Sequence, residues 1–283
     1  MSPTPDHAPE AFTPEWLALR EEADSHARAT APLDPLRTHL AERGAGLGGR
    51  PIRITDLGCG TGSQGRWLAP RLAGPQNWML HDLDPHLLNL AGAHMPRVSA
   101  DGSTVRARMC LRDLDRITTA DLADTDLVTG SALLDLLTRD QVLAIARAAD
   151  EAGCAVLFTL TVTGRVDLHP AHPADASITD AFNDHQRRAG RLGPDATAFT
   201  ARTLRSLGRR VLTYPSPWRL LPEHGDLIRA WLRGRLRAAG EQRGPIPADH
   251  LRHRMDQCER SELGAVVHHT DLLALPNGYP GHP

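Results

Sequence analysis

Two kinds of hydrophobic pattern alternate along the chain. Continuous apolar runs of strand length are separated by segments in which apolar residues return every three or four positions. The first kind predicts strands and the second predicts amphipathic helices, and their regular alternation is typical of an α/β fold with a mostly parallel sheet. The expected strands are 52–56, 77–84, 104–114, 126–135, 155–162, 210–214 and 265–275. The expected helices are 14–28, 35–43, 63–72, 85–91, 139–152, 175–191, 198–207 and 226–239.

A glycine-rich stretch, Asp56-Leu-Gly58-Cys-Gly60-Thr-Gly62, joins the first expected strand to the helix that follows. Glycine permits backbone angles that other residues avoid, and it leaves room for a ligand against the main chain. The free N–H groups at the start of the following helix suit such a ligand. The dinucleotide fingerprint would need a third glycine where Ser63 stands, and a P-loop would need a lysine, which this chain lacks altogether.

A second acidic position follows at the end of the next strand. Asp82 lies about 20 residues beyond the glycine stretch, where a carboxylate can bridge the two hydroxyls of a ribose. Asp84 has a competing interpretation, because an aspartate directly before Pro85 is typical of a helix start. We therefore assign the ribose to Asp82 in preference to Asp84.

This pair of motifs resembles the class I S-adenosylmethionine (SAM) dependent methyltransferases, over roughly 50–163 and, as a strand pattern, 198–275. The resemblance implies a Rossmann-like, seven-stranded, mostly parallel sheet with helices on both faces and an antiparallel seventh strand. It also implies SAM as cofactor and S-adenosylhomocysteine (SAH) as product. Each motif also has an alternative interpretation. The glycine stretch could be a tight turn in another kind of α/β protein, and residues 113–114 could be an exposed strand end that does not bind adenine. The resemblance places at the cofactor Asp56, Gly58, Gly60, Gly62, Asp82, Asp113, Leu114 and Thr129.

The domain organisation follows from the same comparison. Residues 1–50 are expected to form an N-terminal tail and helical lid, and 51–163 the SAM-binding core. A substrate-side insertion occupies 164–197, of which 164–174 is expected to be loop. Residues 198–283 are expected to complete the core, with a helical cap inserted at about 216–263. The ends, 1–12 and beyond 276, are expected to be loose.

The helix expected at 14–28 carries Arg20, Asp24 and Arg28 four positions apart. One interpretation is a stripe of i,i+4 ion pairs, each contributing a few tenths of a kcal/mol. The other is that the helix covers the cofactor site, with Arg28 binding the cofactor and Arg20 the substrate. The apolar face expected to pack inward consists of Trp16, Leu19, Ala23 and Ala27.

A catalytic candidate lies on the helix expected at 175–191. His185 falls on its apolar stripe with Ile178 and Phe182, and a histidine there can act as a general base. A packed, hydrogen-bonded histidine is the alternative. Substrate contacts are expected from Gln186 and Arg187 beside it, and from Trp218 and Trp231 in the cap, although core packing also accounts for each tryptophan. His250 and His253 lack nearby acids, so no metal site is expected.

Composition narrows the possible partners. Acidic and basic residues nearly balance at 34 and 32, so no basic surface for nucleic acid is expected. All the basic residues are arginine, and without lysine a Schiff-base enzyme is excluded. Four scattered cysteines favour a reducing compartment, and without a signal peptide or membrane span a cytoplasmic protein is expected. Gly130-Ser-Ala-Leu replaces the Asn/Asp-Pro-Pro motif of amine-methylating enzymes that act on nucleic-acid bases.

The sequence therefore predicts a bacterial methyltransferase that acts on a small molecule, with O- or N-methylation expected, as a monomer or homodimer. Specialised metabolism is the expected setting. Two alternatives stay open. The chain could bind SAM for another kind of catalysis or as a sensor, or its acceptor could be a macromolecule such as RNA.

Overall fold

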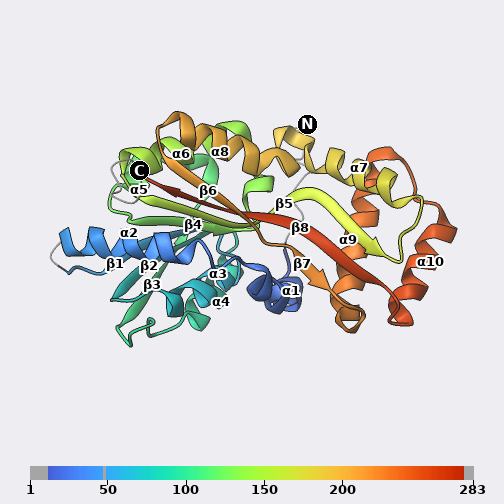
Figure 1. Cartoon of the computed structure of the whole chain (residues 1–283), viewed down its shortest axis with the longest axis horizontal. Coiled ribbons are helices and arrows are strands. Elements are labelled where there is room, and N and C mark those ends of the chain that lie inside the picture. Colours follow the sequence, from blue (N-terminus) through green and yellow to red (C-terminus); the bar gives the residue numbers. More distant parts are fainter. Residues whose placement is uncertain (1–11, 47–48, 277–283) are drawn as a thin grey trace, which may run out of the picture.

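The elements of the chain follow the expected alternation of strands and helices (Figure 1). The computed structural model describes residues 12–46 and 49–276, so the tails expected to be loose lie almost wholly outside it. The strands are β1 Ile52–Leu57, β2 Gln76–Asp82, β3 Val105–Leu111, β4 Leu127–Ser131, β5 Ala155–His169, β6 Arg210–Pro215, β7 Trp218–Leu220 and β8 Gly264–Leu275. The helices are α1 Pro14–Ala27, α2 Leu33–Gly46, α3 Ser63–Leu68, α4 Pro85–His94, α5 Thr119–Leu122, α6 Arg139–Glu151, α7 Asp175–Gln186, α8 Ala196–Ser206, α9 Gly225–Arg243 and α10 Ala248–Glu259.

The sheet has the Rossmann-like order β3-β2-β1-β4-β5-β8-β6, with β7 paired to β8 off this path. Strands β1 to β5 run parallel to one another where they pair, whereas β8 is antiparallel to its neighbours β5 and β6. The seven strands that the sequence predicted are therefore confirmed, and so is the antiparallel direction of the last of them, which is β8. The short β7 is an additional strand. Parallel pairing brings the carboxyl ends of β1, β2 and β4 to one edge, where ligands bind in such sheets.

Helices cover both faces of the sheet (Figure 1). On one face α6 and α8 bury leucines, valines and alanines against β4, β5 and β8. On the other face α2, α3 and α4 bury a second set that includes Trp67, Trp78 and Leu88. Parallel strands covered on both sides are apolar throughout, which is why the runs in the sequence identified them.

A second lobe extends beyond one end of this core (Figure 1). It consists of the outer halves of β5 and β8 together with β7, α7, α9 and α10, and it has its own hydrophobic cluster. The pairing of β5 with β8 runs from 156 to 169 and is interrupted by register shifts between Phe158 and Thr161 and between Val162 and Val166. Leu160 and Gly164 have positive φ at these bulges, which bend the ladder toward the second lobe.

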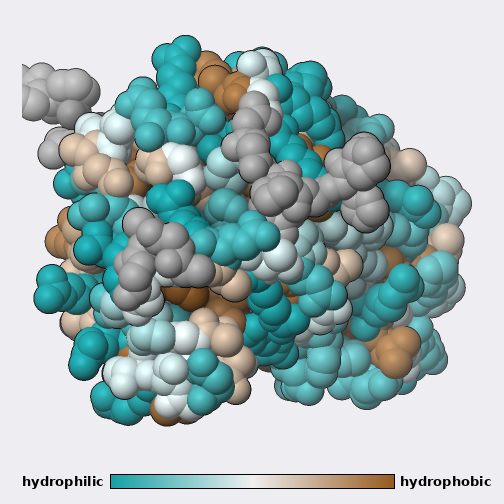
Figure 2. Space-filling model, turned by 60° about the vertical axis from the view of Figure 1, so that its left-hand side comes forward, coloured by the Kyte–Doolittle hydropathy of each residue, from teal (hydrophilic) through white to brown (hydrophobic). Residues whose placement is uncertain are grey.

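Two expectations about 164–191 were wrong. Residues 164–169 are not loop, because Val166 and Leu168 pack into the second lobe while β5 continues its pairing with β8. The helix expected at 175–191 ends at Gln186, since Ala189 takes φ 55° and cannot continue a helix. The face that Figure 2 shows is mostly hydrophilic, with separate hydrophobic areas. In the described part of the chain, no helix has the length and apolarity needed to cross a membrane.

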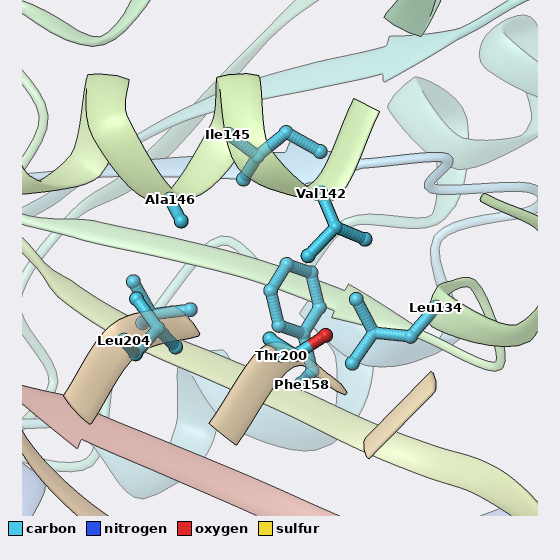
Figure 3. A pocket seen from close by; sticks show the side chains of 8 residues that line it. Leu134, Val142, Ile145, Ala146, Phe158, Thr200 and Leu204 are labelled. Carbon is cyan, nitrogen blue, oxygen red and sulfur yellow. The ribbon is translucent and has the colours of Figure 1, made fainter. Parts of the chain in front are cut away.

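A small cavity of about 10 Å³ lies between α6, α8 and β5 (Figure 3). Its walls are aliphatic and aromatic except for the hydroxyl of Thr200, which is buried and has no hydrogen-bond partner in the described residues. An unsatisfied buried hydroxyl costs about 1–3 kcal/mol, and valine has nearly the same shape and helix propensity as threonine. We expect Thr200→Val to raise the free energy of unfolding by about 1 kcal/mol, measured by chemical denaturation. A less stable variant would contradict this account of the hydroxyl.

Candidate cofactor site at the glycine turn

The turn after β1 needs its glycines. Gly58, Gly60 and Gly62 have φ of 59°, 54° and 86°, a region that side chains rarely adopt. A Cβ on Gly58 would lie 2.9 Å from Leu133 Cδ1, and one on Gly62 would lie 3.1 Å from Ala91 Cα. Gly60 faces α1 instead, where a Cβ would lie 3.3 Å from Leu17 Cδ1. The turn is therefore packed between α4, α1 and the segment that follows β4.

Asp82 is tied directly to this turn. Its Oδ2 accepts a hydrogen bond of 2.7 Å from the Gly60 N–H, and its Oδ1 accepts one of 3.0 Å from the Asp84 N–H. Asp84 itself caps α4, because its Oδ1 accepts from the backbone of His86 and Leu87 at 2.7 and 3.3 Å. The two acids thus have the separate positions that the sequence suggested, with Asp82 at the glycine turn and Asp84 at a helix start.

Helix α1 lies across the turn and is fastened to α3. Glu21 accepts two hydrogen bonds from Arg66, at 2.6 and 2.7 Å. Arg28, just beyond α1, donates from Nη2 to Ser63 Oγ at 2.9 Å and to Ser131 Oγ at 3.0 Å. These contacts join α1 to the start of α3 and to the carboxyl end of β4, which are the two sides of the expected cofactor site.

The inward side of α1 combines apolar and charged residues. Trp16, Ala23 and Ala27 pack against the hydrophobic cluster of the second lobe, as expected, but Leu19 does not. Leu19 is 39% exposed, whereas Asp24 is 5% exposed. The i,i+4 pair of Arg20 with Asp24 exists, with Nε to Oδ2 at 2.9 Å, but it lies inside, with side-chain exposures of 11% and 6%. Asp24 also accepts from Trp218 Nε1 at 2.9 Å, which joins α1 to the second lobe. The charged stripe is therefore not a surface feature.

Two buried ionisable groups remain incompletely satisfied at the turn. Asp56 is fully buried, and neither of its carboxylate oxygens has a hydrogen-bond partner within the described ranges. Burial raises the pKa of Asp56 to about 8, with the Arg28 charge opposing the rise and the Asp82 charge adding to it. Arg28 is 3% exposed, and its Nε and Nη1 likewise find no partner there. Burial lowers the pKa of Arg28, with the charges of Asp24 and Asp271 opposing the change.

The remaining expected cofactor residues have local partners. Asp113 Oδ1 accepts from the Asp115 N–H at 3.0 Å and caps the 3₁₀ turn Leu114–Arg116 that follows β3. The hydroxyl of Thr129 is fully buried, receives a hydrogen bond of 2.9 Å from Gln64 Nε2 and donates one of 2.8 Å to the Leu157 carbonyl. This hydroxyl is engaged inside the core, and the cofactor contact expected of Thr129 stays a prediction.

His185 lies at the end of α7 in the second lobe and not among apolar side chains. Its Nε2 is 3.0 Å from Glu241 Oε2 of α9, and its side chain is 24% exposed. The expected environment was wrong because the helix ends here and the facing part of α9 is charged. Beside it, Gln186 Oε1 is buried without a partner in the described residues, and Arg187 donates to Asp195 Oδ2 at 2.9 Å. Trp231 is partly buried, with the Arg235 guanidinium 5.6 Å from its ring.

Sequence reasoning missed two buried acids near the turn. Asp271 in β8 accepts from the Ala29 N–H and the Leu160 N–H, both at 2.8 Å, and so fastens the end of α1 to the bulge of β5. Asp135, 7% exposed, follows β4 within a run of leucines. In both cases the available signal was an acid inside an otherwise apolar segment, where burial without a role is costly.

No family model matches the chain, and no curated protein does either. Among solved structures it is similar to a SAM-dependent methyltransferase from Geobacter sulfurreducens in complex with SAH, with 13% identity, 94% of this chain and 99% of that one covered, and TM-score 0.43. It is also similar to the YcgJ protein from Bacillus subtilis, with 14% identity, coverages of 85% and 99%, and TM-score 0.44. A third is magnesium protoporphyrin IX methyltransferase from Synechocystis with bound SAH, with 16% identity, coverages of 65% and 76%, and TM-score 0.39.

Proposed function

We propose that the chain is a SAM-dependent methyltransferase that acts on a small molecule by O- or N-methylation. The observation that carries the proposal is the glycine turn, whose central N–H is bound by Asp82 from the tip of the neighbouring strand. This arrangement sets a carboxylate beside the glycine turn at the carboxyl edge of the sheet, where ligands bind in such folds. A cytoplasmic location, a monomer or homodimer, and bacterial specialised metabolism belong to the same proposal.

The unsatisfied groups at the turn fit this cofactor. The methionine part of SAM carries an ammonium and a carboxylate, and a buried carboxylate and a buried guanidinium suit those charges. Asp56 would accept from the cationic side and Arg28 would donate to the anionic side, with Ser63 beside it. Asp82 would receive the ribose hydroxyls, and the turn at Asp113 and Leu114 would border the adenine.

When bound, SAM supplies a methyl group on a sulfonium that is already a good leaving group. The chain then has to bind the acceptor, align it and exclude water, and alignment alone can lower a barrier by roughly 7–11 kcal/mol. Helix α1 covers the turn, and Asp24 with Trp218 connects this cover to the second lobe. We assign the acceptor to the region between the two lobes, with Arg20, Trp218, Gln186, Arg187 and Trp231 as the residues that border it.

Titration of SAM and of SAH into the purified chain, followed by heat of binding, tests the cofactor assignment directly. We expect a single site that binds both ligands, because the contacts proposed for Asp56, Arg28 and Asp82 are to parts that SAM and SAH share. The absence of heat with either ligand, confirmed by an unchanged melting temperature, would overturn the proposal.

We also propose that His185 orients the acceptor, with Glu241 holding its ring. His185→Ala is expected to lower kcat/KM roughly tenfold, the equivalent of one hydrogen bond to the acceptor, while SAH affinity stays within about twofold. Radiolabelled methyl transfer to an acceptor found by screening, together with SAH titration, measures both quantities. Glu241→Gln is the matched variant, because it keeps a hydrogen-bonding partner and should have a smaller effect. Equal turnover in His185→Ala and the wild type would remove His185 from the site.

A further inference from the structure

Asp135 is a buried carboxylate that takes no part in the contacts proposed for the cofactor. It lies in the 3₁₀ turn Leu134–Leu136 directly after β4, is 7% exposed, and has no hydrogen-bond partner for Oδ1 among the described residues. The turn that carries it is firmly held. The Ala132 N–H donates to the Thr159 carbonyl at 2.9 Å, and the Leu192 N–H donates to the Leu137 carbonyl at 2.8 Å. A side chain on such a support has little freedom to move away.

The turn that carries Asp135 is packed against the proposed cofactor site. Leu133, at its start, is the residue that a Cβ on Gly58 would strike, at 2.9 Å. Ser131, at the end of β4, receives the hydrogen bond of 3.0 Å from Arg28. Ala132 between them has φ 50°, a strained value for a residue with a side chain, and such strain gathers at functional sites.

Charged groups from two other elements act on Asp135. They are Arg20 of α1 and Arg191 of the segment after α7. Burial raises the pKa of Asp135 to about 6, and a hydrogen bond from its own backbone, followed by the charges of these two arginines, opposes the rise. Arg20 also acts on His269 of β8, where burial lowers the pKa to about 3, so that this ring is neutral at physiological pH. His269 Nδ1 is buried and has no partner within the described chain.

We propose that Asp135 faces the atom to be methylated and accepts its proton, from a hydroxyl or neutral amine of an uncharged acceptor. This rests on the proposed function. As the new oxygen–carbon or nitrogen–carbon bond forms, the sulfur–carbon bond breaks and its electron pair stays on sulfur. The proton of the acceptor passes to the Asp135 carboxylate, which releases it to water afterwards. A carboxylate that is half ionised near pH 6 is suited to this role at neutral pH.

The proposal can be tested without knowing the acceptor. Sinefungin is a SAM analogue in which a carbon bearing a protonated amine replaces the sulfonium and its methyl, whereas SAH is neutral at that position. If Asp135 faces this position, the wild type should bind sinefungin more tightly than SAH. The ratio of the two affinities should grow about tenfold between pH 5 and pH 7.5, because the carboxylate ionises over that range. Asp135→Asn, which keeps the shape of the side chain, should bind SAH normally and show no such growth.

The matched control is Asp140→Asn, which removes the same charge from an exposed position in the first turn of α6 and should behave as the wild type does. A preference that is equal in Asp135→Asn and the wild type at all pH values would overturn the role of Asp135. Failure of the wild type to bind SAH at all would instead overturn the proposed function, so the two failures are distinguishable.

Discussion

Replacing Asp82 with alanine should abolish measurable binding of SAM and SAH while leaving the chain folded. The Asp82 carboxylate is proposed to accept from the ribose hydroxyls, and it also holds the Gly60 N–H at 2.7 Å. Hydrogen bonds to a charged group contribute about 1.5–3 kcal/mol each, so losing two of them corresponds to roughly a hundredfold or larger fall in affinity. Heat of binding measures the affinity, and thermal unfolding shows that the variant is folded.

Asp84 offers a matched control two residues along the same chain. It caps α4 through His86 and Leu87, so Asp84→Ala is expected to cost about 1 kcal/mol of stability. Its affinity for SAH should nevertheless stay close to that of the wild type. If Asp82→Ala binds as tightly as Asp84→Ala, the ribose assignment is wrong. If both variants lose affinity together, the effect comes from disorder at the end of β2 and not from a lost contact.

The strands of the core could be predicted because each one is recognisable from its own residues, without knowledge of its neighbours in the sheet. β1, β2, β4 and β5 are covered on both faces and therefore read as apolar runs. The outer half of β5 could not be predicted in the same way. Gly164 resembles the end of a strand, and the alternation of Val166 and Leu168 has meaning only once β8 pairs beside it. The early end of α7 depends in a similar manner on how 187–193 packs against the turn after β4.

The glycine turn and Asp82 could be predicted because short-range spacing fixes both. The burial of the Arg20–Asp24 pair could not, since the same i,i+4 pair would form on a surface helix. The partner that Asp24 reaches inside, Trp218, is 194 positions away in the chain. For the same reason the sequence placed His185 among apolar residues, because its partner Glu241 is 56 positions away.

Asp126 fastens the N-terminal segment to the sheet at the end opposite the glycine turn. Its side chain is 4% exposed and accepts from Arg43 Nε at 2.6 Å and from Arg50 Nη1 at 2.7 Å. The Arg53 N–H adds a further hydrogen bond of 2.9 Å. Burial acts to raise the pKa of Asp126, but these hydrogen bonds outweigh it and hold the pKa below its usual value. The carboxylate therefore stabilises the fold in its charged form.

Asp126→Ala is expected to lower the free energy of unfolding at pH 7 by about 3–5 kcal/mol, because it leaves two partly buried arginines without their partner. Asp124→Ala is the matched control, since Asp124 pairs with Arg53 at 2.9 Å but is 86% exposed, and it should cost less than about 1 kcal/mol.

Because the pKa of Asp126 is depressed in the folded chain, the contribution of its carboxylate to stability is present above about pH 4 and is lost as the pH falls through the folded value. Denaturation curves between pH 7 and pH 3 should therefore show the wild type and Asp126→Ala converging. A constant gap between them at all pH values would mean that packing, and not the charge, accounts for the loss.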